Sequence, residues 1–200
     1  MRTSNNIEIV KKLQQEKLSL FTLADFCRLF GVANQQTVYK KIQRLEQKGV
    51  IKRLIKGKYI FLLEKPNEFE IANFLRQPSY VSLESALSFY GIIAGFPHQT
   101  TSVTTKKTKL YVFEGKDYQY AQINPNLFWG YEKKENFLIA DKEKSLIDFL
   151  YLAHKGWRII SLDKLKGQFD LTEIDKSRFK DYCQMVKNKH FLKFLKQVSL

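Results

Sequence analysis

Apolar residues recur at helical spacing in the first part of the chain. In the segment from roughly 5 to 16, Ile9 and Leu13 are four residues apart and share one helical face, which predicts a short amphipathic helix. A second segment, LADFCRLF, follows Thr22 and stops at Gly31. A threonine followed three residues later by an aspartate is typical of a capping box, and a glycine often ends a helix. We therefore predict a second helix between Thr22 and Gly31.

A third helical segment, QQTVYKKIQRLEQK, begins a few residues after Gly31. Asn34 precedes it and is a favourable N-cap residue. At about 100° per residue, Val38, Ile42 and Leu45 share one face, which we expect to be buried. The polar and basic side chains of this helix then project from the opposite face.

The hydrophobic period changes after the third helix. Residues 50–55 and 59–63 are rich in β-branched and aromatic side chains, and Lys56-Gly57-Lys58 separates them. This pattern predicts a β-hairpin with a basic tip. The order of helix, helix, short turn, helix and basic hairpin is that of a winged helix-turn-helix, which we assign to residues 1–65.

The remainder of the chain predicts a second domain. Residues 66–77 form a linker, in which 68–76 favours a short helix, and the domain covers 78–200. We expect one helix that begins after Ser82 and a buried helix that begins after Asp141. Strands are expected in TTSVTT, LYVFEG, YQYAQI and FLIA, and further helical patterns cover 161–168 and 175–198. The predicted fold class is α+β, with the winged helix-turn-helix followed by a mixed α/β domain with a mostly antiparallel sheet and helices.

Charge adds a functional indication. The chain has a formal net charge of +14, and residues 1–65 account for +9 of it, with 14 basic and 5 acidic side chains. Such an excess favours a polyanionic partner, either nucleic acid or an anionic membrane surface. No apolar stretch is long enough to span a bilayer and no signal peptide is visible, so we expect a cytoplasmic protein.

The remaining composition argues against metal and cofactor chemistry. Cys27 and Cys183 lack CxxC spacing and are expected to be free thiols in a reducing compartment. His98, His154 and His190 are scattered without ligand spacing, so neither a metal nor a cofactor is expected. We also find no GxSxG elbow, no P-loop and no GxGxxG, and we predict that the chain is not an enzyme.

The predicted third helix is suited to double-stranded DNA. The major groove admits one α-helix, and a helix-turn-helix inserts its second helix with the N-terminal residues nearest the bases. Glutamine can pair with adenine, lysine can donate to guanine, and further basic residues suit phosphates. The candidate DNA-binding residues are Gln35, Gln36, Thr37, Tyr39, Lys40, Lys41, Gln43, Arg44 and Lys48 on the helix, and Lys52, Arg53, Lys56 and Lys58 on the hairpin.

Simpler interpretations compete with DNA binding. A basic helix with an apolar stripe is usually a solvated surface helix, and a lysine hairpin is usually a solvated turn. Winged helices also serve as protein-docking modules. The coincidence of caps, short turn, basic outer face and basic hairpin in the right order favours DNA over these alternatives. RNA is disfavoured because neither an aromatic RNP pattern nor a GXXG clamp is present.

Three motifs in the second domain resemble one protein family. PSYVSLESALSFYGII (78–93), TTSVTTKKTK (100–109) and FLIADKEKSLIDFLYL (137–152) look like the AbiEi family of bacterial abortive-infection antitoxins. Together with the N-terminal pattern, the resemblance covers most of the chain to about residue 155. The stretch from residue 162 onward matches only a generic helical pattern.

The resemblance implies a function that composition does not. Such proteins look like the antitoxin and autorepressor halves of type IV toxin–antitoxin systems, which bind inverted repeats in their own promoter. The partner toxin is a nucleotidyltransferase, and the type IV class implies neutralisation without a stable complex. Some relatives regulate other operons with no toxin neighbour. Inverted repeats call for two protein copies, so the chain is expected as a monomer or a dimer on DNA.

Single residues of the second domain allow two interpretations. Lys106, Lys107 and Lys109 follow a predicted strand and are candidates for a partner or DNA surface, although a solvated turn is the commoner outcome. Ser82 and Asp141 are expected to act as N-caps rather than as functional groups.

Overall fold

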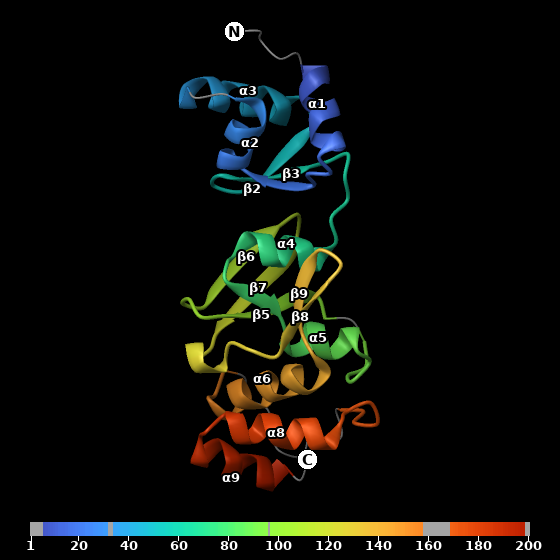
Figure 1. Ribbon diagram of the computed structural model, residues 1–200, viewed down its shortest axis with the longest axis vertical. Helices are drawn as coiled ribbons and strands as arrows, with labels where there is room; N and C mark the ends of the chain where they lie inside the picture. Colours follow the sequence, from blue (N-terminus) through green and yellow to red (C-terminus); the bar gives the residue numbers. More distant parts are fainter. Residues whose placement is uncertain (1–5, 32–33, 96, 158–168, 199–200) are drawn as a thin grey trace. The chain divides into compact units, whose positions relative to one another are not determined.

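The computed structural model describes residues 6–31, 34–95, 97–157 and 169–198, so the helix predicted at 161–168 lies outside the described residues. The chain divides into two compact units, which we call unit 1 (residues 1–75) and unit 2 (residues 76–200) (Figure 1). Between them they combine helices with an antiparallel and a mixed sheet, so the chain is α+β.

Unit 1 combines four described helices with a small sheet. Its elements are α1 (Asn6–Gln15), β1 (Leu20–Thr22), α2 (Leu23–Phe30), α3 (Gln35–Gln47), β2 (Ile51–Ile55), β3 (Lys58–Phe61) and α4 (Glu68–Leu75). The sheet is antiparallel in the order β1-β3-β2. The helices and the hairpin lie where the sequence pattern predicts them, and α4 lies within the predicted linker. Strand β1 was not predicted, because three residues are too few to show a period of two.

The predicted caps of α2 and α3 are confirmed. The backbone N–H of Asp25 donates to Thr22 Oγ1 at 3.1 Å, and the N–H of Thr22 donates to Asp25 Oδ2 at 2.9 Å. Gly31 ends α2 in the left-handed conformation, with φ of 59°. Asn34 Oδ1 accepts from the N–H groups of the second and third residues of α3. These side chains satisfy backbone donors that a helix N-terminus leaves unpaired.

The capping box leads to a first prediction. Thr22→Ala removes the acceptor for the Asp25 N–H, and we expect it to lower the free energy of unfolding of unit 1 by about 1 kcal/mol. Thr22→Ser keeps the hydroxyl and is the matched control. Thermal unfolding followed by circular dichroism measures both variants. Equal melting temperatures for the alanine and serine variants would contradict a stabilising role for the box.

The core of unit 1 is formed by one face each of α1, α2 and α3 and by the sheet. The residues buried there are Ile9, Leu13, Phe21, Phe26, Val38, Ile42, Leu45, Ile51, Tyr59 and Phe61. Val38, Ile42 and Leu45 were predicted to form the inner face of α3, and each is at most 2% exposed. This burial fixes which side of α3 faces solvent.

Unit 2 is built on a six-stranded sheet. Its elements are β4 (Ser79–Val81), α5 (Leu83–Phe89), β5 (Gln99–Thr104), β6 (Lys109–Phe113), β7 (Lys116–Gln122), the short 3₁₀ helix η1 (Pro125–Leu127), β8 (Tyr131–Lys134), β9 (Phe137–Ala140), α6 (Lys142–His154), α8 (Lys176–Met185) and α9 (Lys189–Val198). The strand order is β6-β7-β5-β4-β9-β8. Figure 1 shows α6 between the sheet and the pair α8 and α9.

The topology of this sheet is more mixed than the sequence predicts. Strands β5 and β7 pair in parallel, as do β4 and β9, while β4–β5, β6–β7 and β8–β9 are antiparallel. The short strands β4 and β8 were not predicted. The helical pattern over 175–198 is also two helices, because residues 186–188 separate α8 from α9.

The burial of α6 is confirmed, and one neighbouring residue corrects an expectation. Asp141 accepts the N–H of Lys144 and caps α6 as predicted. Ser82 makes no capping hydrogen bond at α5, because its hydroxyl donates to Asp148 instead. Tyr90 is half-buried, with its hydroxyl 3.5 Å from Glu132 Oε1. Both predicted free thiols are unpaired.

No helix among the described residues is long and apolar enough to cross a membrane.

Candidate nucleic-acid interface

Helix α3 presents a polar and basic face opposite its buried stripe. Gln36, Thr37 and Tyr39 are exposed near its N-terminus, Tyr39 to 46%. Gln35 opens the helix, but its side chain lies outside the described part of the structure. Asn34 engages only the backbone N–H groups of Gln36 and Thr37, so their side chains remain available to a ligand.

A row of cations follows along the same helix. Lys40 and Arg44 lie on one side of α3, Lys48 follows four residues later as its C-cap residue, and all three are exposed. Gln43 is exposed beside them, whereas Lys41 is half-buried. Within the described residues, Lys40 and Arg44 have no hydrogen-bond or ion-pair partner. In that part of the chain, no acidic side chain neutralises their charges.

The hairpin contributes further cations beside its turn. Lys52 and Arg53 are exposed on β2, which is an edge strand, and Lys56 is exposed at the turn. The turn is anchored, because the backbone N–H of Leu23 donates to the carbonyl of Gly57 at 2.9 Å. This bond joins the hairpin to the first residue of α2 and limits how far the tip can move independently.

Lys58 departs from its predicted role. It was expected at the hairpin tip facing DNA, but it begins β3 and is half-buried. Its Nζ donates to the carbonyl oxygens of Phe74 at 2.5 Å and Leu75 at 3.2 Å, and lies 5.0 Å from the Phe74 ring. The ammonium thus satisfies carbonyls at the C-terminal end of α4, where a cation is favoured by the helix dipole. We remove Lys58 from the candidate interface.

The basic turn of unit 2, which contains Lys106 and Lys107, is exposed and is held by contacts to neighbouring side chains. Lys106, Lys107 and Lys109 all face solvent. The guanidinium of Arg76 donates to the carbonyl of Lys107, and Lys109 Nζ lies 5.8 Å from the Tyr111 ring. The turn therefore has a defined backbone and three solvent-facing charges, which fits either interpretation given to it above.

A buried polar network in unit 2 was missed at the level of sequence. Lys144 and Asp148 of α6 form an ion pair at 1% and 2% side-chain exposure. Tyr80 and Ser82 donate to Asp148 Oδ2 at 3.0 and 2.8 Å, and Lys144 Nζ lies 2.9 Å from the Tyr80 hydroxyl. Burial, reinforced by the Asp148 charge, raises the pKa of Tyr80 well above its usual value.

The surroundings of this pair are aromatic and tight. Lys144 Nζ lies 4.9 Å from the Trp129 ring, a distance at which a cation is attracted to the indole face. A Cβ at Gly130 would come within 2.9 Å of Lys144 Cγ, so only glycine leaves room for the lysine chain. The sequence signal for such a pair was a lysine and an aspartate four residues apart, with the aspartate inside the largely apolar stretch SLIDFLYLA.

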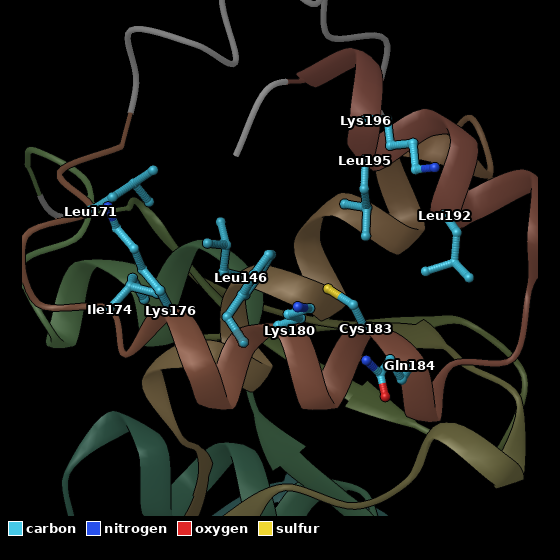
Figure 2. Close-up of a pocket in the computed structure, with 11 residues that line it drawn as sticks. Leu146, Leu171, Ile174, Lys176, Lys180, Cys183, Gln184, Leu192, Leu195 and Lys196 are labelled. Atoms are coloured by element: carbon cyan, nitrogen blue, oxygen red, sulfur yellow. The ribbon is translucent and has the colours of Figure 1, made fainter.

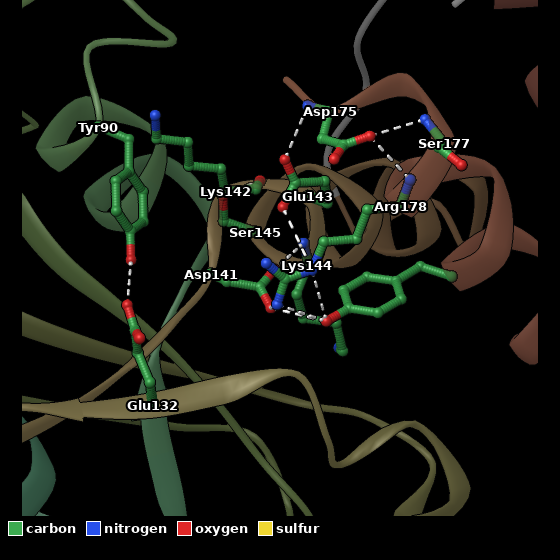
Figure 3. Close-up of polar contacts among 11 residues, drawn as sticks. Tyr90, Glu132, Asp141, Lys142, Glu143, Lys144, Ser145, Asp175, Ser177 and Arg178 are labelled. Atoms are coloured by element: carbon green, nitrogen blue, oxygen red, sulfur yellow. Dashed lines mark hydrogen bonds and ion pairs between the residues drawn. The ribbon is translucent and has the colours of Figure 1, made fainter. Parts of the chain in front are cut away.

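A second polar cluster joins the N-terminal end of α6 to α8 (Figure 3). Asp141 Oδ2 accepts from Arg178 at 2.9 Å and from the Tyr182 hydroxyl at 2.8 Å. Glu143 Oε1 accepts the backbone N–H of Asp175 at 3.0 Å. Burial raises the pKa of Asp141, although the hydrogen bonds from Lys144 and Tyr182 and the charge of Arg178 oppose this effect. These contacts position α8 on α6.

The two clusters differ in exposure. The side chains of Lys144 and Asp148 are 1% and 2% exposed, whereas that of Arg178 is 51% exposed. In the part of the chain that the structure describes, no group of three or more His, Cys, Asp or Glu residues could hold a metal ion. Searches found no family model that matches the chain and no matching curated protein.

Proposed function

We propose that residues 1–65 form a winged helix-turn-helix and that α3 inserts into the major groove of double-stranded DNA. The observation that carries this proposal is the exposure of Lys40 and Arg44, which have no side-chain partner among the described residues, on the side of α3 opposite its buried stripe. A helix in the major groove needs one face on the protein and a polar face free for bases and phosphates. Helix α3 meets both conditions.

The side chains divide into two roles in this proposal. Gln36, Thr37 and Lys40, near the N-terminus of α3, read base edges, since amide and ammonium groups match acceptors and donors in the major groove. Arg44 and Lys48 lie further along and bind phosphates, which sets the register of the complex. On the hairpin, Lys52, Arg53 and Lys56 contact the adjacent backbone as the wing.

We further propose that the protein is a transcriptional autorepressor and the antitoxin of a type IV toxin–antitoxin system. This step rests on the three motifs that resemble the AbiEi family and not on geometry. A regulator of another operon is the alternative that shares the same DNA interface. An adjacent gene for a nucleotidyltransferase would favour the antitoxin assignment over that alternative.

A mobility-shift titration with the DNA upstream of the chain's own gene tests DNA binding. Because cations on phosphates release counterions, about five such contacts should weaken binding by a few hundredfold between 50 and 200 mM salt. A shuffled duplex of the same length and composition is the control, and it should bind more weakly. A docking module would give no shift at any salt concentration, and that result would refute the proposal.

A further inference from the structure

Unit 2 contains an apolar groove that the proposed function does not use. The groove has a volume of about 600 Å³ and lies among α6, α8, α9 and the segment that precedes α8 (Figure 2). Small-molecule sites in proteins have volumes of about 300–1,000 Å³. The groove is therefore large enough for a ligand of that class.

The floor and walls of the groove are apolar. Lining side chains of this kind are Leu146, Leu171, Ile174, Phe179, Cys183, Leu192 and Leu195. Leu146, Cys183 and Leu195 are buried and form the floor. Burial raises the pKa of Cys183 to about 11, so its thiol remains uncharged near neutral pH. A hydrocarbon chain placed here would leave water and contact only apolar groups and one neutral thiol.

The polar side chains around the groove carry one sign of charge. Lys176, Lys180 and Lys196 line it and are exposed, while no aspartate or glutamate is among its lining residues. Within the described residues, none of the three ammonium groups has a hydrogen-bond or ion-pair partner. Lys176 and Lys180 are four residues apart on α8, and Lys196 comes from α9, so the charges border the groove from two helices (Figure 2).

We propose that this groove binds an anionic amphiphile, specifically the alkyl chain and carboxylate of a long-chain fatty acid. The alkyl chain of the fatty acid contacts the leucines and Phe179, and its carboxylate pairs with the lysine ammonium groups. Burial of methylene groups supplies the affinity, while the lysines select the sign of the head group. Binding at this site does not depend on the DNA interface of unit 1, so the two proposals can fail separately.

Fluorescence titration of the full chain with cis-parinaric acid tests the site directly. Three competitors of equal chain length, all below their micellar concentrations, then distinguish the head groups: dodecanoate, dodecanol and dodecyltrimethylammonium. We expect dodecanoate to displace the probe. Dodecanol should compete roughly tenfold more weakly, because it lacks the charge attraction of the lysines, and the cation should compete least.

Charge variants test the lysines. Lys180→Glu with Lys196→Glu should weaken cis-parinaric acid binding by roughly tenfold or more, since attraction becomes repulsion. Lys180→Arg with Lys196→Arg keeps the charge and should retain binding. Lys65→Glu with Lys133→Glu, at two exposed lysines that do not line the groove, makes the same change in net charge and is the control. Leu192→Asp places a carboxylate in the groove and should also weaken binding.

Several results would overturn the proposal. One is the absence of saturable cis-parinaric acid binding by the wild-type chain. Another is equal displacement by the carboxylate and the ammonium compound, which would indicate a non-specific apolar surface. Binding that appears only after Ile159→Asp and Leu162→Asp would mean that the chain's own segment 158–168 occupies the groove. Displacement by an acidic amphipathic peptide but not by dodecanoate would assign the groove to a protein partner.

Discussion

Replacing both Lys40 and Arg44 by alanine should lower the affinity for the upstream duplex by about a hundredfold at physiological salt, because a base or phosphate contact of this kind contributes roughly 1–3 kcal/mol. Both side chains are exposed and lack partners within the described residues, so little folding stability should be lost. The mobility-shift titration measures the affinity. Circular dichroism checks that the variant remains folded.

The control for this double variant removes the same amount of charge elsewhere. Lys133→Ala with Lys193→Ala changes two exposed lysines on β8 and α9 and should alter affinity only slightly. The salt dependence adds a second readout, since loss of the Arg44 phosphate contact should reduce the slope of log K against log salt by roughly one. A double Lys40 and Arg44 variant that binds as tightly as the wild type would remove α3 from the interface.

Asp148→Ala should strongly lower the free energy of unfolding of unit 2. It leaves the ammonium of Lys144 buried without its counter-ion, and breaking such a pair costs about 3–5 kcal/mol. Tyr80 and Ser82 would also lose the acceptor of their hydroxyl groups. Trp129 and Trp157 are the only tryptophans of the chain and both belong to unit 2, so tryptophan fluorescence during urea unfolding reports on this unit.

A paired replacement distinguishes the cost of an unpaired buried charge from the cost of lost packing. Lys144→Met with Asp148→Leu removes both charges and keeps apolar volume, and it should recover a large part of the stability lost in Asp148→Ala. This recovery would show that the cost comes from an unpaired buried charge. If the single variant lost less than about 1 kcal/mol, solvent would have to reach Lys144, contrary to its burial.

Local chemistry explains which parts of the fold could be predicted. Thr22, Gly31 and Asn34 act on backbone groups within a few residues of themselves, so their roles are readable from the order of the chain. The apolar stripe of α3 was predictable for the same reason, since helical periodicity determines which side chains share a face. The exposed side of α3, and with it most of the candidate DNA interface, followed from that stripe.

Long-range contacts explain what could not be predicted. Lys58 looked like a free lysine at a hairpin tip, but its ammonium binds carbonyls of residues sixteen and seventeen positions later. Ser82 looked like an N-cap, yet its hydroxyl donates to Asp148, sixty-six residues away. Strands β1, β4 and β8 have three or four residues each, and they exist through the partners they pair with rather than through a pattern of their own.

The sequence by itself determined where the helices of unit 1 begin and end, which side of α3 is buried, and where positive charge is concentrated. These are consequences of interactions between near neighbours and of composition. Only the tertiary structure decided the strand order of the mixed sheet, the enclosure of Lys144 with Asp148, and the meeting of α8 and α9 around an apolar groove. Those features arise when segments far apart in the sequence pack together and exclude water. The spacing of side chains along the sequence does not predict which distant segments will do so.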